Sequence, residues 1–388
     1  MPGCATLIYR VAMSGSWQKD LLGNPALVEV ERGLGEFNAG RPVLITSGCA
    51  TVMALPVDGM SNASLAAFRN ACAPNLPYLL VTARRARALG IAGSGPAALA
   101  IGEVIDALGL LALAAENRPC RQVHAQRPGP GANAAIELAK LAHRLPALLL
   151  ADWRVSNDVP FVSVAAEAIL QFRRAASASV AIAAEATVPL NGGFAARFVV
   201  FRDSTGGSPV AVVVGSPDVT KPVAVRLHSA CLTGDVFGSR RCDCGDQLRL
   251  ALAQLQQHGG GIILYLEQEG RGLGLANKMR SYQLQDAGLD TVDANTVLGF
   301  DDDERDYGVA VHMLHTLGCT RVRLLTNNPA KLDGLARAGI DIFGRVPLQG
   351  PVNADNRRYL TAKATRAGHH LEHVLRAVAA NPAQPEES

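Results

Sequence analysis

Three of the eight cysteines lie close together in the sequence. Ten residues separate Cys231 from Cys242, and one residue separates Cys242 from Cys244. Three thiolates suit a soft tetrahedral ion such as zinc, and they leave its fourth position open for the water that a hydrolysis needs. Buried small hydrophobic residues or a redox pair would give the same cluster, since structural zinc sites usually have four ligands. The spacing alone therefore indicates a hydrolytic zinc site and leaves the other two interpretations open.

A glycine-rich turn lies downstream of the cysteines, between a predicted strand and a predicted helix. Its centre reads Glu269-Gly270-Arg271. Glycines allow backbone N–H groups to approach an anion, and the guanidinium of Arg271 adds a fixed positive charge. The pattern favours a phosphate site, although on its own it is equally compatible with a plain loop.

Two further segments combine charge with a predicted element boundary. The acidic run 301–307 is predicted to open a helix, where carboxylates offset the helix dipole without any catalytic role. The segment 321–331 reads as a strand, an Asn-Asn-Pro turn and a helix start. Ligands of α/β sheets bind at the carboxyl ends of strands, which predicts that Thr326 and Lys331 lie beside the glycine-rich turn.

The segment 226–248, which contains the three cysteines, closely resembles the zinc segment of GTP cyclohydrolase II, and the resemblance extends from about residue 177 to 373. It implies that Cys231, Cys242 and Cys244 bind one Zn²⁺ per chain. It also implies that zinc-bound water opens the imidazole ring of GTP, with release of formate and pyrophosphate, as the first step of riboflavin biosynthesis. The family further implies Mg²⁺ bound with the triphosphate, and a homodimer.

The resemblance also assigns roles to individual residues. It implies that Asp303 accepts a proton and that Tyr282 and Arg305 are catalytic. Because a guanidinium is always protonated, we expect Arg305 to clamp a phosphate and not to act as a nucleophile. The substrate-binding residues that it implies are Arg226, Gln247, Glu269, Gly270, Arg271, Thr291, Thr326 and Lys331.

Two positions depart from the family pattern. Ala230 stands where the family usually has glutamate, and Asp302 where it commonly has a small residue. These departures leave two alternatives open. One is a related enzyme that uses another purine nucleotide or stops after ring opening. The other is a catalytically weak GTP-binding or scaffold paralogue that supports another riboflavin-pathway enzyme.

The first half of the chain resembles dihydroxybutanone phosphate synthase over residues 36–46. That family continues with a dense acidic loop, but no acid occurs here in residues 47–54. Residues 127–141 resemble the entrance to a helix of the same family, yet Gly131 and Asn133 occupy its usual His and Glu positions. We therefore predict that residues 1–176 form a degenerate, non-catalytic synthase-like domain.

Hydrophobic periodicity predicts an α/β (α+β) fold with two domains, the second (177–378) holding a mixed sheet with βαβ units and the three-cysteine site. Residues 379–388 are predicted to form a disordered tail. The predicted strands are 41–46, 78–82, 180–187, 195–202, 211–214, 223–228, 261–266 and 321–326. The predicted helices are 64–73, 96–108, 133–142, 275–285, 304–317 and 330–338.

Composition limits the class of protein. A hydrophobic content of 48% and a charged content of 18% over 388 residues exclude disorder of the whole chain. A net charge of +3 is too mild to indicate nucleic-acid binding, and no apolar run is long enough for a membrane span. Because no secretory signal is readable, the eight cysteines indicate a reducing, cytoplasmic location.

Overall fold

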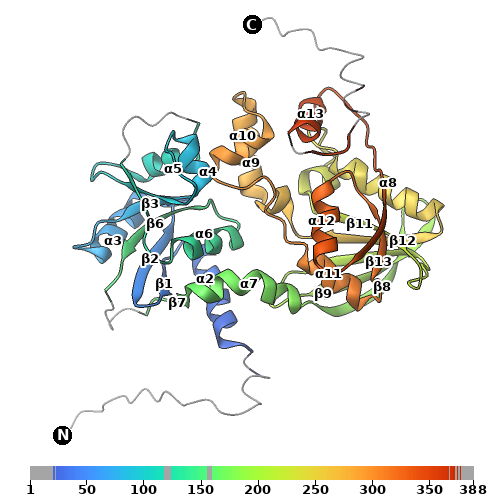
Figure 1. Ribbon diagram of the computed structural model, residues 1–388, viewed down its shortest axis with the longest axis horizontal. Helices are drawn as coiled ribbons and strands as arrows, with labels where there is room; N and C mark the ends of the chain where they lie inside the picture. Colours follow the sequence, from blue (N-terminus) through green and yellow to red (C-terminus); the bar gives the residue numbers. More distant parts are fainter. Residues whose placement is uncertain are drawn as a thin grey trace, which may run out of the picture.

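The computed structural model describes residues 21, 23–117, 124–154, 160–366, 368–371, 374 and 376. In these residues the chain forms two seven-stranded sheets, one in each half, which lie side by side (Figure 1). This arrangement confirms the predicted α/β (α+β) fold with two domains. The predicted disordered tail, 379–388, lies outside the described residues, and no described helix is long and apolar enough to cross a membrane.

The first sheet is mostly antiparallel and has the strand order β5-β4-β3-β6-β2-β1-β7. Its strands are β1 (Val43–Ser47), β2 (Ala50–Pro56), β3 (Tyr78–Val81), β4 (Ala97–Ala100), β5 (Ala125–Gln126), β6 (Ala147–Asp152) and β7 (Ser163–Ala165). Its helices are α2 (Pro25–Asn38), α3 (Asn62–Cys72), α4 (Ala83–Ala88), α5 (Ala107–Ala115), α6 (Ala132–Leu141) and α7 (Ala166–Ala178). Only β1 and β7 pair in parallel.

The second sheet is mixed, with the order β14-β13-β11-β12-β10-β9-β8. Its strands are β8 (Ala181–Leu190), β9 (Phe194–Arg202), β10 (Val210–Gly215), β11 (Val223–Ser229), β12 (Gly260–Leu266), β13 (Arg321–Leu325) and β14 (Asp341–Val346). Its helices are α8 (Cys244–Gln257), α9 (Leu275–Asp286), α10 (Thr291–Val297), α11 (Gly308–Thr316), α12 (Pro329–Arg337) and α13 (Arg357–Thr365). The strands β14, β13, β11 and β12 run parallel, and α8 and α12 connect them in the βαβ units β11-α8-β12 and β13-α12-β14.

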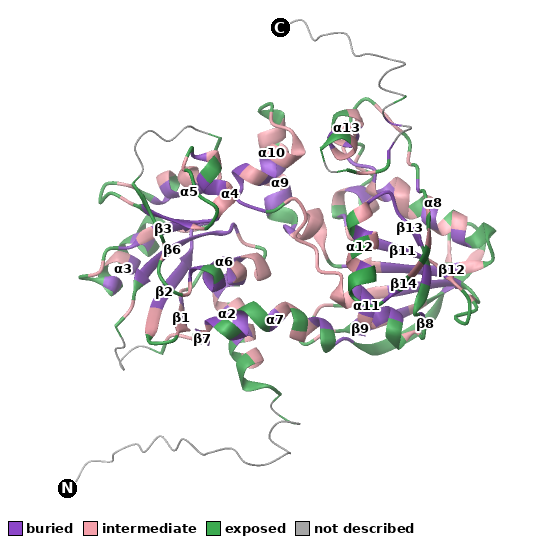
Figure 2. Cartoon of the chain, viewed as in Figure 1, coloured by how far each residue is buried: buried purple, intermediate pink, exposed green. Residues whose placement is uncertain are grey.

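Alternating side chains give each sheet two apolar faces, and Figure 2 shows the central strands of both sheets as mostly buried, whereas the edge strand β8 is exposed. In β12, Ile262 and Leu264 pack with the cluster that includes α11, whereas Ile263 packs with the cluster that includes α8. Only glycine fits at position 261 of this strand, because a Cβ would lie 2.4 Å from the carbonyl oxygen of Ala224. The second sheet is therefore covered by helices on both sides.

Two predicted helices differ from the structure. Residues 96–108 are not one helix, because Ala97–Ala100 pairs with β3 as β4, and α5 begins only after Asp106 caps it. The alanines there favour a helix locally, but strand pairing overrides that preference. The acidic run 301–307 is not helical either, and α11 begins at Gly308, because the Asp306 carboxylate accepts from the Gly308 N–H at 2.8 Å.

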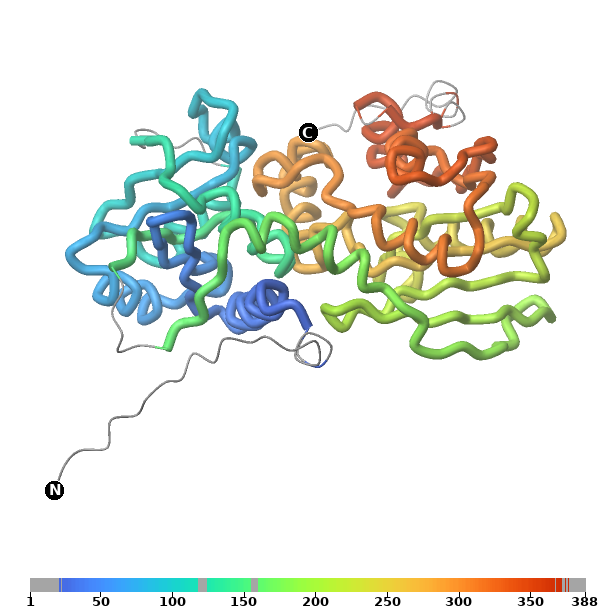
Figure 3. The backbone as a smooth tube through the Cα atoms, turned by 60° about the horizontal axis from the view of Figure 1, so that its bottom comes forward, coloured from blue at the N-terminus to red at the C-terminus, as the bar shows by residue number. Residues whose placement is uncertain are grey.

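A buried interface joins the two halves. Leu145 from the first half packs with Leu273, Leu298 and Phe300 from the second. The helix α7 leaves the first sheet and also contacts α11, and Figure 3 shows this segment running from one half to the other. Between the two sheets lie α9 and α10 (Figure 1). The two domains thus share apolar surface instead of being joined by a linker alone.

Arg85 in α4 ties this interface together. Its side chain is only 2% exposed. The guanidinium donates to the carbonyl oxygens of Leu113, Ala112 and Glu116 in its own half at 2.8–3.2 Å, and to that of Val297 in the second half at 2.9 Å.

The substitution Arg85→Met should therefore destabilise the whole chain by about 3 kcal/mol, because it leaves four carbonyl groups without this donor. Urea unfolding followed by circular dichroism measures the effect. The matched control is Arg87→Met, which alters an exposed arginine of the same helix and should change the free energy of unfolding by less than about 0.5 kcal/mol. Equal effects of the two variants would contradict this account of Arg85.

Candidate active site

Three parallel neighbouring strands bring the chemically suggestive segments to one edge of the second sheet. The strand β11 pairs in parallel with β12 and with β13, and Ser229 at the end of β11 lies opposite Leu266 at the end of β12. Cys231 follows β11, the glycine-rich turn follows β12, and Thr326 follows β13. The carboxyl ends of parallel strands meet at one edge, which explains why segments far apart in the sequence meet here.

The three cysteine sulfurs converge at this edge. All three Sγ atoms lie within 4.8 Å of one another, and those of Cys231 and Cys242 are 3.7 Å apart. Two sulfurs bound at about 2.3 Å to one tetrahedral zinc ion are separated by about 3.8 Å. The trio therefore fits the predicted ion. Within the described part of the chain it is also the only group of three His, Cys, Asp or Glu side chains placed closely enough to hold a metal.

Lys278 of α9 connects the cysteine trio to the glycine-rich turn. Its ammonium group donates to the Cys231 sulfur at 3.0 Å, to the Thr233 hydroxyl at 2.9 Å and to the Glu269 carboxylate at 2.9 Å. Burial opposes its charge, but the bonds to Cys231 and Glu269 raise the pKa of Lys278 above its ordinary value. The other oxygen of Glu269 accepts from the Leu232 N–H at 2.7 Å. Glu269 thus fastens the turn to the segment that follows Cys231.

The turn itself has an unusual backbone. Gly270 has φ +63° and Arg271 has φ +66°, so two successive residues adopt the left-handed conformation. Glycine adopts it freely, whereas an L-residue such as arginine pays roughly 1–2 kcal/mol. The backbone carbonyl of Arg271 accepts from the Glu304 N–H at 3.1 Å, and its side chain donates to the Asp302 carbonyl at 3.3 Å. The turn is therefore held against the acidic run.

Asp303 and Arg305 form a pair within that run. The Arg305 Nε donates to the Asp303 carboxylate at 2.7 Å, and the Tyr307 hydroxyl donates to the same carboxylate at 3.1 Å. Burial alone would raise the pKa of Asp303, but the bonds from Arg305 bring it below its usual range. The pKa of Arg305 is raised, because its bond to Asp303 outweighs burial. Both groups are therefore charged at neutral pH.

A chain of buried polar groups runs along the other side of the trio. Lys363 donates to Asp243 at 2.9 Å, and Asp243 lies between two of the cysteines. The second oxygen of Asp243 accepts from Gln247, and the amide oxygen of Gln247 accepts from Arg226. Arg226 also donates to the Leu325 carbonyl at 3.0 Å. These bonds fix the side chain of Gln247 at both ends.

Lys331 is buried without an acidic partner at bonding distance among the described residues. Its ammonium group donates to the carbonyl oxygen of Leu227 at 2.8 Å. Burial, with a further contribution from the positive charges of Arg226 and Arg305, lowers the pKa of Lys331 well below its ordinary value. An anion bound beside Lys331 would favour the charged form of this lysine and raise its pKa.

The structure brings nearly all of the predicted site residues to one cavity. Asp303 is the exception, because it reaches the cavity through its partner Arg305. Tyr282 lies on α9 at the cavity wall, and Thr291 is the first residue of α10. The predicted residues that line the cavity are Arg226, Cys231, Cys242, Cys244, Gln247, Glu269, Gly270, Arg271, Tyr282, Thr291, Arg305, Thr326 and Lys331.

The cavity-lining residues that the sequence did not indicate include Lys278, Tyr359 and Lys363. Lys278 precedes Tyr282 by one helical turn, and that spacing could have revealed it. Lys363 meets Asp243 across 120 positions, which no local pattern indicates. His369 also lines the cavity, and burial followed by the nearby cations lowers its pKa to about 2.

The geometry thus places a thiol trio that could hold a metal ion beside a cavity rich in lysine and arginine. The family model described as GTP cyclohydrolase II matches residues 181–347. A protein of Azospirillum brasilense named GTP cyclohydrolase-2 is 44% identical over 313 residues, which cover 76% of this chain and 81% of that protein. A protein of the same name from Xylella fastidiosa is 41% identical over 360 residues, or 90% of this chain and 89% of its own length.

Two other proteins are also similar. The riboflavin biosynthesis protein RibBA of Bacillus cytotoxicus is 41% identical over 252 residues, which cover 61% of this chain and 64% of that protein. The crystal structure of RibBX from A. baumannii, a two-domain 3,4-dihydroxy-2-butanone 4-phosphate synthase, covers 83% of this chain and 99% of its own, with 14% identity and a TM-score of 0.30.

Binding of inorganic pyrophosphate should be accompanied by uptake of a proton on Lys331. A polyanion beside this buried lysine raises a pKa that the free site holds well below the ordinary value, so the bound state carries more protons. Calorimetric titration at mildly alkaline pH, in two buffers of different ionisation enthalpy, measures the number of protons taken up. The Lys331→Met variant is the control, and equal proton uptake by the two proteins would contradict the prediction.

Proposed function

The chain belongs to the GTP cyclohydrolase II family and is a hydrolase with a place in riboflavin biosynthesis, and from this membership we propose that it opens the imidazole ring of GTP. The products are formate, pyrophosphate and the diamino-ribosylamino-pyrimidinone phosphate. The observation that carries the proposal is that the thiol trio and six lysine and arginine side chains share one cavity. These basic residues are Arg226, Arg271, Lys278, Arg305, Lys331 and Lys363.

The metal requirement follows from the donor set. Three thiols fit Zn²⁺, and among the described residues they have no fourth Cys, His, Asp or Glu ligand nearby. When bound there, zinc would supply a Lewis acid with an open position, where the pKa of a water molecule falls to about 7. For Mg²⁺ the described residues offer no comparable cluster, and Glu269 is engaged by Lys278 and Leu232. We propose that Mg²⁺ arrives bound to the triphosphate oxygens.

The protein residues divide the remaining work. Gln247 would bind the guanine base, because Arg226 and Asp243 hold its amide in one orientation. Lys331, Arg271 and Arg305 would hold the phosphates and offset charge that develops during the reaction. Asp303 is ionised at neutral pH and would accept a proton. The pKa of Tyr282 is raised by burial, so its hydroxyl stays protonated as a donor.

One observation favours the alternative of a catalytically weak GTP-binding paralogue. Ala230 lines the cavity, and its methyl group offers no charge where the family usually has glutamate. Its backbone N–H donates to the Leu266 carbonyl at 2.8 Å, which keeps the chain in place whatever the side chain. Tight GTP binding without formate release would favour this alternative over the enzyme.

We propose further that the first half is a synthase-like domain that lacks synthase chemistry. The strands β1 and β2 pair directly from Ser47 to Ala50, so that only Gly48 and Cys49 lie between them. This turn has no room for an acidic metal-binding loop. Gly131, at the expected His position, caps α6 with a φ of +85°. The cytoplasmic location and the homodimer stay predictions.

The substitution Cys242→Ser should abolish both bound zinc and formate release, because a neutral hydroxyl is a poor replacement for a thiolate ligand. Elemental analysis of the purified protein and an assay of formate and pyrophosphate from GTP measure the two effects. Cys49→Ser alters an exposed thiol in the first half and should change neither. Full formate release by metal-free protein would refute the mechanism.

The full chain should form no dihydroxybutanone phosphate from ribulose phosphate under conditions in which it releases formate from GTP. The reason is that the acid and base positions of the synthase pattern hold Gly131 and Asn133. Product analysis by mass spectrometry tests this expectation. Formation of the synthase product would show that the first half retains catalysis of its own.

A further inference from the structure

Two of the residues to which we assign proton transfer and phosphate binding lie in a segment without regular structure. We call residues 301–306 the acidic loop. It contains Asp303 and Arg305 and lies between α10 and α11. In its own half, the acidic loop is held by the bonds from Glu304 and Arg271 described above, by the Tyr307 hydroxyl and by the Gln268 amide, which donates to the Asp306 carbonyl. None of these bonds involves the carboxylates of Asp301 and Asp302.

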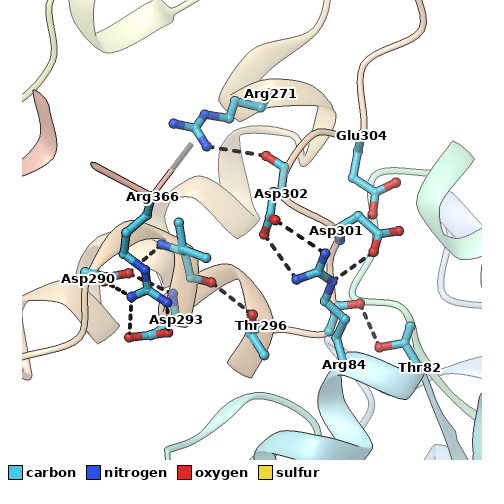
Figure 4. A network of polar contacts seen from close by, with 12 residues as sticks. Thr82, Arg84, Arg271, Asp290, Asp293, Thr296, Asp301, Asp302, Glu304 and Arg366 are labelled. Carbon is cyan, nitrogen blue, oxygen red and sulfur yellow. Dashed lines mark hydrogen bonds and ion pairs between the residues drawn. The ribbon is translucent and has the colours of Figure 1, made fainter. Parts of the chain in front are cut away.

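The first half supplies the missing contacts. Arg84 of α4 donates to Asp301 at 2.9 Å and, with two further N–H groups, to Asp302 at 3.2 and 3.4 Å. Figure 4 shows this guanidinium lying between the two carboxylates. Lys140 of α6 reaches Glu304 at 2.6 Å and Asp301 at 3.2 Å. Two cations of the first half thus bind three of the four acidic side chains that surround Asp303 and Arg305 in the loop.

Neutral contacts fix both ends of the same segment. Before the acidic loop, the Thr82 hydroxyl donates to the Gly299 carbonyl at 2.7 Å, also visible in Figure 4. At its end, the Ser177 hydroxyl donates to the Asp306 carboxylate at 2.7 Å. A Cβ on Gly299 would lie 2.9 Å from the Thr82 oxygen, so the two halves approach closely here.

The glycine-rich turn is braced in the same way. Asn277 of α9 donates to the backbone carbonyl of His143 at 2.9 Å, and a Cβ on Gly274 would lie 2.8 Å from the Cβ of His143. Both loops that would hold the triphosphate therefore rest on the first half of the chain.

We propose that the first half acts as a positioning domain for the reaction of the second, with Arg84 and Lys140 as positioning residues. Neither residue lines the cavity, and each acts through the acidic loop on Asp303 and Arg305. The role of Asp303 and Arg305 in this inference rests on the proposed function. The contacts themselves belong to the chain whatever its substrate.

The exposure of the ion pairs of Arg84 makes the proposal testable apart from folding. Asp301 is 57% exposed and Asp302 is 48% exposed at their side chains, and exposed ion pairs add little to the stability of a protein. Lys140 and Glu304 are only 12% and 10% exposed, so loss of Lys140 would also destabilise the fold. A displaced catalytic group reduces a rate by about 100-fold for about 1 Å of misplacement. Loss of Arg84 alone should therefore affect turnover far more than unfolding.

The test compares the full-length variant Arg84→Ala with the unaltered chain. We expect kcat for formate release from GTP to fall by about 10-fold or more. The KM for GTP should change by less than about threefold, because five cavity cations other than Arg305 remain in place. Zinc content should be unchanged, and the melting temperature should fall by only about 2 °C. Amide hydrogen exchange should rise in residues 301–306 and stay unchanged in β11 and β12.

Two further variants separate positioning from general disturbance. Arg87→Ala removes an exposed cation from the same helix and should keep the kcat of the unaltered chain. Arg84→Glu should lower kcat at least as much as Arg84→Ala, and combining it with Asp302→Arg should recover at least threefold, since the pair is restored with reversed charge.

Several results would overturn the proposal. They are unchanged exchange in residues 301–306, a kcat within twofold of the unaltered chain, or a loss of kcat that only follows a loss of folded protein. If the unaltered chain released no formate, the proposed function would fail. The exchange measurement would still decide whether the first half holds the acidic loop.

Discussion

The parallel pairing of β11 with β12 and β13 is the constraint on which the rest of this structure depends. It brings three carboxyl ends to one edge, and each is followed by a segment with its own chemistry: Cys231, the glycine-rich turn and Thr326. A shift of one residue in either pairing would turn alternate side chains to the opposite face of the sheet. The two apolar faces, each covered by helices, prevent such a shift. The packing that stabilises the core therefore also fixes the geometry of the site.

Charge distinguishes the site from the rest of the sheet edge. Gathering cations in one buried cavity is unfavourable unless each is compensated. Lys278 is compensated by Glu269, Lys363 by Asp243 and Arg305 by Asp303. Lys331 and Arg226 have no bonding acid among the described residues, and burial pulls the pKa of both below their usual values. These two basic residues therefore lie where a polyanionic substrate would supply the missing negative charge.

The first half has a complete sheet and an apolar core of its own. At the two places where we propose that synthase residues are lacking, it has a tight turn and a capping glycine. It also presents a surface that matches the second half. Asp302, which departs from the family pattern, lies against Arg84 from that surface. The residue that departs from the family pattern therefore takes part in a contact between the two halves.

The sequence by itself determined six of the seven strands of the second sheet, the cysteine trio as a candidate metal site and the family, because local periodicity, close spacing and long motifs indicate them; β14 was not predicted. Strands such as β12 and helices such as α9 lie within one residue of their predicted bounds. It did not determine β4, where pairing with β3 overrides the helix preference of its alanines, or the acidic run, whose carboxylates bind Arg305, Arg84 and Lys140 and do not open a helix. Nor did it reveal Lys363, which meets Asp243 only after a long stretch of chain has folded. Only the tertiary structure decided these, because each depends on a partner far away in the sequence, and a local pattern carries no record of that partner.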